Sequence, residues 1–175
     1  MMKRRALNLA VSAQCASRRT ALLAALVIPF GYCVETLPAA PKKRVQLNIA
    51  SDGDLLAFKP DHLSCAPGAA VHLTFSHTGK YITQDHNWVL TVPGAAEAVA
   101  QAAMAAGENS RWTPRGDKRI LAATPPCGKG QHVSVDFVAP APGDYPFLCT
   151  TPGHGAVMHG VLHVTPKLNS SMSGR

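Results

Sequence analysis

A short segment near the C-terminus, LCTTPGHGAVMHG at 148–160, gathers three side chains of the kinds that bind transition metals. Cys149 offers a thiolate, His154 an imidazole and Met158 a thioether. Pro-Gly at 152–153 forces a turn, so the cysteine and the histidine can face one point, to which the methionine returns as the next strand begins. This mixture of ligands favours copper, and a trigonal Cys-His-His set with a weak axial Met is the blue-copper electron-transfer arrangement.

The segment lacks the second imidazole that such a site needs. The other histidines of the chain are His62, His72, His77, His86, His132, His159 and His163. His62 falls in a turn-like region, and alternation of apolar neighbours predicts that His72 and His132 face solvent. His159 and His163 follow the segment and are expected to point outward, where they stay candidates for ligands at a second site.

Two histidines, His77 and His86, therefore remain as candidates for the missing ligand. His86 opens the strand-like sequence HNWVL, where rigid backbone can hold a ligand. It is followed by Asn87, whose amide can hydrogen-bond across to the Cys149 loop and hold it in place.

The elements that must position these residues are predicted to be short strands. Segments with strand-like alternation or composition are found at 45–50, 55–58, 71–77, 86–92, 118–124, 132–139, 145–150 and 157–165. Alanine-rich residues 94–110 form the one helical candidate, with Gly107 placed to end it. Short strands separated by Gly/Pro turns predict an all-β sandwich with one short helical insertion.

The N-terminal 40 residues differ from the rest. A basic start, an apolar run at 21–30 and small residues at 39–40 indicate an export signal, and the apolar run is about half of the roughly 20 residues needed to span a bilayer. Ser17-Arg18-Arg19 with the following residues resembles a twin-arginine motif. We therefore expect a signal at 1–40, a domain at 41–166, a flexible tail at 167–175, a periplasmic location and no stable membrane insertion after signal removal.

Charge argues against nucleic acid as a partner. The formal net charge is +7, but residues 1–40 hold five Lys/Arg and one Glu. The remainder carries twelve basic and nine acidic residues, a net charge of +3, with no basic cluster interleaved with aromatics.

Three of the five cysteines lie beyond the predicted signal: Cys65, Cys127 and Cys149. An odd number in an exported protein indicates that one is not in a disulfide, and Cys149 is the natural odd one. Cys65 and Cys127 could then pair in an oxidising compartment.

The sequences DHNWVLTV and FLCTTPGHGAVMHGVL together resemble the azurin and auracyanin branch of the cupredoxins. The resemblance covers about residues 45–165, and the Cys–His–Met spacing is specific to this branch. It implies an eight-stranded Greek-key sandwich that binds one copper ion, Cu(I) or Cu(II).

The resemblance also implies which residues bind the metal. His86, Cys149 and His154 lie in the plane and Met158 is axial, while His77, which ends LTFSHTG, is a buried neighbour rather than a ligand. The backbone carbonyl of the residue before the first histidine, here Asp85, is a second distant axial neighbour.

This chain departs from the family pattern at three positions. Asp85 stands where glycine is usual, and Thr151 stands where a bulky apolar residue is common. The first strand has no cysteine, so the family's disulfide to the position of Cys65 is missing.

The expected function is to shuttle single electrons between periplasmic redox proteins, such as a cytochrome c or a copper reductase, which dock where the His154 edge reaches the surface. The protein is not expected to be an enzyme, because no second copper site with paired histidines is evident. The alternative is a periplasmic copper carrier or buffer that uses the same ligands in an open site.

Overall fold

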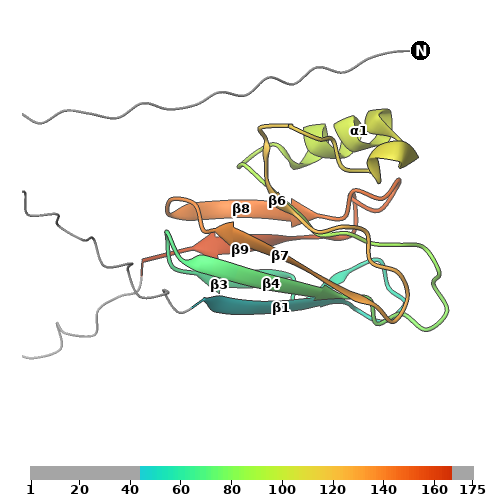
Figure 1. The fold of residues 1–175 in the computed structure, drawn as a ribbon, viewed down its shortest axis with the longest axis horizontal. Coiled ribbons are helices and arrows are strands. Elements are labelled where there is room, and N and C mark those ends of the chain that lie inside the picture. Colours follow the sequence, from blue (N-terminus) through green and yellow to red (C-terminus); the bar gives the residue numbers. More distant parts are fainter. Residues whose placement is uncertain (1–43, 167–175) are drawn as a thin grey trace, which may run out of the picture. The chain divides into compact units, whose positions relative to one another are not determined.

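Residues 44–166 form two β-sheets and one short helix in a computed structural model (Figure 1). The signal predicted at 1–40 and the tail predicted at 167–175 lie outside the described residues. Within 44–166, no helix is both long and apolar enough to cross a membrane.

The nine described strands divide between a four-stranded and a five-stranded sheet. The first sheet has the order β2 (Phe58–Lys59), β1 (Val45–Ser51), β4 (Ala70–Ser76), β7 (His132–Val138). The second has the order β3 (His62–Cys65), β9 (His159–Val164), β8 (Gly143–Leu148), β5 (Val89–Thr91), β6 (Ile120–Ala123). Strands that follow one another in the chain often belong to different sheets, and the two sheets together form the predicted β-sandwich. The expected fold class is confirmed.

The core lies between the two sheets and follows from alternation along the strands. In β4, Val71, Leu73 and Phe75 are buried while the residues between them are half-buried. Phe58 contacts the rings of Phe75 and Phe147 edge to face, at centroid distances of 5.6 and 5.4 Å. These aromatic contacts join the two sheets and hold the segments that contain the predicted metal ligands.

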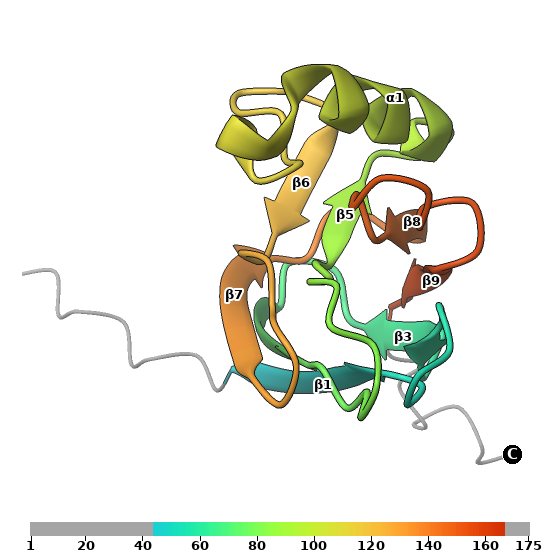
Figure 2. The same cartoon turned by 90° about the vertical axis from the view of Figure 1, so that its right-hand side faces the viewer.

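The helix α1 (Ala96–Ala106) covers the outer face of the five-stranded sheet beside β5 and β6 (Figure 2). Val99 packs with Ala95 and with Val89 of β5, so the helix buries the outward-facing Val89, while Leu90 of the same strand belongs to the core between the sheets. The helix ends at Gly107, whose φ of 70° is a backbone conformation that glycine adopts without strain, as predicted. A short 3₁₀ helix (Glu108–Ser110) follows.

Two strand predictions needed correction. His62, predicted to lie in a turn, begins β3 and pairs with Val161 of β9, a partner remote in sequence. The strand expected at 86–92 contains regular pairing only at Val89–Thr91, because His86 makes an isolated bridge to Cys127 instead.

The possible disulfide between Cys65 and Cys127 is absent, and both are buried free thiols. Cys65 is the last residue of β3 and pairs with Val164, the last residue of β9, whereas Cys127 pairs with His86. Val164, the partner of Cys65, lies six residues beyond Met158, which is about 20 Å along an extended strand. Cys65 is therefore at the end of the sandwich far from Met158, whereas Cys127 is at the end that contains His86.

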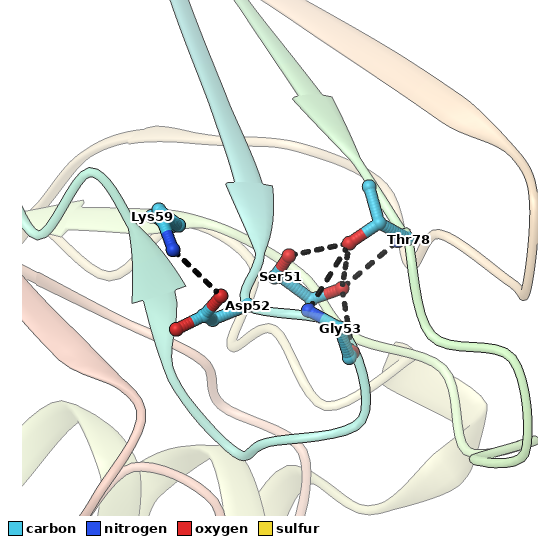
Figure 3. Close-up of polar contacts among 5 residues, drawn as sticks. All are labelled: Ser51, Asp52, Gly53, Lys59 and Thr78. Atoms are coloured by element: carbon cyan, nitrogen blue, oxygen red, sulfur yellow. Dashed lines mark hydrogen bonds and ion pairs between the residues drawn. The ribbon is translucent and has the colours of Figure 1, made fainter.

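A polar network fixes the end of β4, where His77 follows (Figure 3). The backbone N–H of Thr78 donates to Ser51 Oγ at 2.9 Å, and the Thr78 hydroxyl donates to the Ser51 carbonyl. Nearby, Lys59 pairs with Asp52 at 3.2 Å across the β1–β2 turn. The end of β1 is thereby tied to the segment that leads from His77 towards His86.

Candidate metal centre

Three buried side chains, His86, Cys149 and His154, present their ligand atoms to one another. Their ligand atoms all lie within 4.8 Å of one another. The two Nδ1 atoms are 3.1 Å apart, and Cys149 Sγ lies 3.9 Å from Nδ1 of His86 and 3.6 Å from Nδ1 of His154. None of the three residues is more than 3% exposed. Two imidazoles and a thiol that converge in this way form a group that could hold a metal ion.

His86 is held by its backbone and by a neighbouring ring. Its N–H donates to the Cys127 carbonyl at 3.1 Å, and its carbonyl accepts from the Cys127 N–H at 2.7 Å. The buried His77 ring lies against the His86 ring with the centroids 4.7 Å apart. His77 is thus a buried neighbour of His86, as the resemblance implied, and lies outside the three-residue group.

The connection from β8 to β9 carries Cys149, His154 and Met158. The Cys149 N–H donates to the Met158 carbonyl at 2.9 Å, and the Met158 N–H donates to the His154 carbonyl at 2.8 Å. Met158 is fully buried immediately before β9, where the sequence placed it. In Figures 1 and 2 this connection lies beside α1 at one end of the sandwich.

Asn87 joins the His86 segment to the Cys149 segment, as predicted. Its Oδ1 accepts the Thr150 N–H at 2.8 Å, and its Nδ2 donates to Thr150 Oγ1 at 2.7 Å and to Thr113 Oγ1 at 3.3 Å. The Thr150 hydroxyl donates onward to the Trp112 carbonyl. The residues after the helical insertion therefore also hold the loop that carries Cys149 and His154.

Gln84 is a site residue that sequence reasoning did not find. Its side-chain Oε1 lies 3.1 Å from His154 Nε2, and its backbone oxygen lies 3.1 Å from His77 Nε2. Both oxygens accept, so both Nε2 atoms carry the proton, and Nδ1 of His154 is left free to bind a metal. His154 is only 3% exposed, so the expectation that its ring edge reaches the surface was wrong.

Asp85, proposed as an axial neighbour through its carbonyl, is engaged by the loop. Its backbone oxygen accepts the Thr151 hydroxyl at 2.9 Å. The polar residue at 151, where an apolar one is common, thus has a structural role. A carbonyl has two lone pairs, so this hydrogen bond leaves one of them for another neighbour.

Burial controls the protonation of the three residues. Burial, and then the charges of His154 and His77, lowers the pKa of His86 to about 4, and burial lowers the pKa of His154 as well. Both rings are therefore neutral at neutral pH and can offer a lone pair. Burial raises the pKa of the Cys149 thiol, while hydrogen bonds from Thr151 and from the Asn87 backbone act in the opposite direction. A metal cation would compensate the buried thiolate.

The remaining histidines lie outside this cluster. His132 and His159 are exposed, while His72 and His163 are half-buried on outward-facing strand positions, as predicted. None of them is brought to the site.

The donor set fits copper. A thiolate and two imidazoles in a closed, buried group, with a buried methionine beside them in the chain, match the ligand types of a blue-copper centre. The sandwich and this group define a cupredoxin-type protein. A family model described as copper binding proteins, plastocyanin/azurin family, matches residues 44–165, and the chain belongs to that family. The expected cofactor, one copper ion, and the resemblance are confirmed.

Relatives and solved structures agree with this assignment. Auracyanin-A of Chloroflexus aurantiacus is 37% identical over 122 residues, covering 69% of this chain and 74% of the relative. Azurin of Bordetella pertussis is 43% identical over 95 residues, 51% of this chain and 63% of that protein. The structure of auracyanin A, a "blue" copper protein from Chloroflexus aurantiacus, superposes with a TM-score of 0.65 at 36% identity, covering 70% of this chain and all of the other. Proteins of this family generally transfer electrons.

Proposed function

We propose that this protein carries single electrons in the periplasm and uses one copper ion held by His86, Cys149 and His154, with Met158 as a weak axial ligand. The observation that carries the proposal is the convergence of the Sγ and two Nδ1 atoms within 4.8 Å in a buried site. The Asp85 carbonyl is the candidate for a second, distant axial neighbour, beside its bond from Thr151.

When bound, the copper ion supplies a one-electron couple between Cu(I) and Cu(II). The protein's part is to keep the ligands in place during that change. The paired hydrogen bonds between Asn87 and Thr150 and the backbone bond from Cys149 to Met158 oppose movement of the loop. When the ligands are held in one geometry, the metal can gain or lose an electron with little movement of the protein. An electron carrier needs such a site.

Electrons are proposed to pass through the His154 ring. The loop that carries His154 exposes the small or apolar residues Pro152, Gly153, Ala156 and Val157, while the polar Gln84 covers the ring edge on the other side. Such a surface lets a redox protein, for example a cytochrome c or a copper-containing reductase, approach closely. If the path is correct, His154→Gly loses fast exchange with the partner, whereas exchange at the native rate would contradict it.

The alternative is a copper carrier or buffer with the same ligands, which needs an exchangeable site. The four residues proposed as ligands are at most 3% exposed, which favours retention of the ion. The copper-loaded protein should therefore exchange electrons reversibly with a cytochrome c while a competing chelator takes no copper. Loss of copper to the chelator on reduction would support the carrier. We do not assign an enzymatic activity.

The location and domain limits are part of the proposal. Residues 1–40 act as a cleaved export signal, and 41–166 form the copper domain, followed by the tail at 167–175. Mass spectrometry of the protein from the periplasmic fraction would show a chain beginning near residue 41. Recovery of the uncleaved chain in the cytoplasm would contradict this location.

A further inference from the structure

Three polar side chains gather on the outer face of the five-stranded sheet, away from the copper site. His62 lies on β3, His163 on β9 and Asp144 on β8. Asp144 pairs directly with His163, and His62 pairs with Val161, two residues earlier on β9. Side chains at directly paired positions and at positions two residues apart project from the same face of a sheet, so all three project from this one.

The three side chains form a hydrogen-bonded row. Nδ1 of His163 lies 2.7 Å from Asp144 Oδ1, and Nε2 of His163 lies 3.0 Å from Nδ1 of His62. The planes of the two rings differ by 3°, and their centroids are 5.2 Å apart. With two ring nitrogens at 3.0 Å, this centroid distance places the rings edge to edge rather than face to face.

The row determines which nitrogens can bind a ligand. The Asp144 carboxylate only accepts, so Nδ1 of His163 carries a proton and Nε2 of the neutral ring holds a lone pair. That lone pair faces Nδ1 of His62. A carboxylate that receives the far N–H of a histidine is the usual support of a metal-binding imidazole, since it fixes the tautomer and raises ligand basicity.

We propose that His62 Nδ1 and His163 Nε2, supported by Asp144, form a second, surface site for a divalent transition-metal ion. In the free row the His163 lone pair accepts the Nδ1–H of His62, so a shared ion at the metal–imidazole distance of about 2.0–2.1 Å requires both rings to turn and the His62 proton to move to Nε2. Cu(II) binds nitrogen ligands most strongly among the first-row dications, and its tetragonal preference leaves two adjacent positions for these rings. The His62 side chain is exposed and the His163 side chain is 38% exposed, so both rings can turn towards an ion whose other positions hold water.

This site is separate from the proposed copper centre. His163 is five residues from Met158 along β9, about 17 Å of extended strand. Occupation of one site therefore leaves the ligands of the other untouched.

The opposite sheet contains a matched control. His72 of β4 lies 2.7 Å from Asp136 of β7 through its Nδ1, the same carboxylate–imidazole pair at the same distance. Among residues 44–166, no second histidine hydrogen-bonds to His72. The pair alone should not hold an ion, and the second imidazole is what distinguishes the His62–His163 site.

The test is a Cu(II) titration of protein whose buried site already holds one Cu(II) ion, followed by electron paramagnetic resonance and equilibrium dialysis. We expect a second equivalent to bind with a tetragonal signal coupled to two nitrogens. His62→Ala and His163→Ala should each weaken this binding at least tenfold, and Asp144→Asn about tenfold. His72→Ala should leave it unchanged.

Two results would overturn the proposal. One is the absence of a second two-nitrogen signal in the unchanged protein. The other is a signal that persists at the same affinity in His163→Ala, or falls equally in His72→Ala, because the ion would then lie elsewhere. The visible absorption of the buried site serves as the folding control for every variant, since all four positions are on the outer surface.

Discussion

The side-chain oxygen of Gln84 accepts a hydrogen bond from Nε2 of His154 at 3.1 Å, on the side of the ring opposite to Nδ1, the atom proposed to bind the metal. The backbone oxygen of the same residue accepts from His77 Nε2 at 3.1 Å. One exposed residue thus orients the proposed exit ligand and fixes the ring that packs on His86.

Removal of the Gln84 amide should open the His154 edge. In Gln84→Ala the backbone bond to His77 stays, and only the cover over His154 Nε2 is lost. We expect the rate of electron exchange with a small soluble oxidant to rise severalfold. Thr83→Ala, an exposed neighbour without a bond to His154, is the control and should behave like the unchanged protein. Equal rates in all three proteins would show that Gln84 does not limit access.

The Asn87–Thr150 pair should contribute measurably to stability. Asn87→Ala leaves the Thr150 N–H buried without its partner, which costs about 1–3 kcal/mol. Urea unfolding of the metal-free variant measures this loss. Thr113→Val removes the 3.3 Å bond from Asn87 and a long bond of 3.4 Å to the Arg111 carbonyl, and should cost less because neither bond is fully buried. A larger loss for Thr113→Val than for Asn87→Ala would mean that the pair is not what holds the loop.

Asp54 should hold the loop that leads to Gln84. Its Oδ1 accepts the backbone N–H groups of Lys80, Tyr81 and Ile82 at 2.8, 2.8 and 3.1 Å. These bonds, those from Tyr81 and Ile82 first, lower the pKa of Asp54 below its ordinary 3.8. The stabilisation is therefore present above pH 3.8 and is lost as the pH falls through the lower, folded-state pKa.

Hydrogen exchange of the three amides tests the role of Asp54. Asp54→Ala should expose them to fast exchange at neutral pH. Asp52→Ala removes only the surface pair with Lys59 and should leave their protection intact. Unchanged protection in Asp54→Ala would contradict the assignment.

Acid should destabilise the metal-free protein through its buried histidines. The pKa of His86 is lowered from 6.5 to about 4, mainly by burial, and that of His154 is lowered too. The unfolded chain therefore binds protons that the folded chain does not, and stability falls as the pH falls from about 6.5 to about 4. His86 alone accounts for about 2 kcal/mol between pH 7 and pH 5. Urea unfolding at both values should show this difference, reduced in His86→Gln; an equal difference in the two proteins would refute it.

The sequence was sufficient to predict the sandwich, the end of the helix at Gly107 and the convergence of Cys149 and His154, because these depend on local spacing and turn chemistry. Gln84 was missed because its role depends on where a loop side chain meets a ring 70 residues away. The alternation in β3 is short, and its partner β9 lies about a hundred residues further on, so His62 looked like part of a turn. The Cys65–Cys127 pairing was inferred only from the odd number of cysteines, which says nothing about the distance between the two residues.

The central claim is that Cys149 binds copper as a thiolate together with two imidazoles. The most direct test is the visible absorption spectrum of residues 41–175 after addition of one equivalent of Cu(II). The account predicts an intense band that makes the protein blue, lost on reduction and absent in Cys149→Ser. Only weak metal-centred absorption, unchanged by Cys149→Ser, would contradict it and favour the copper carrier.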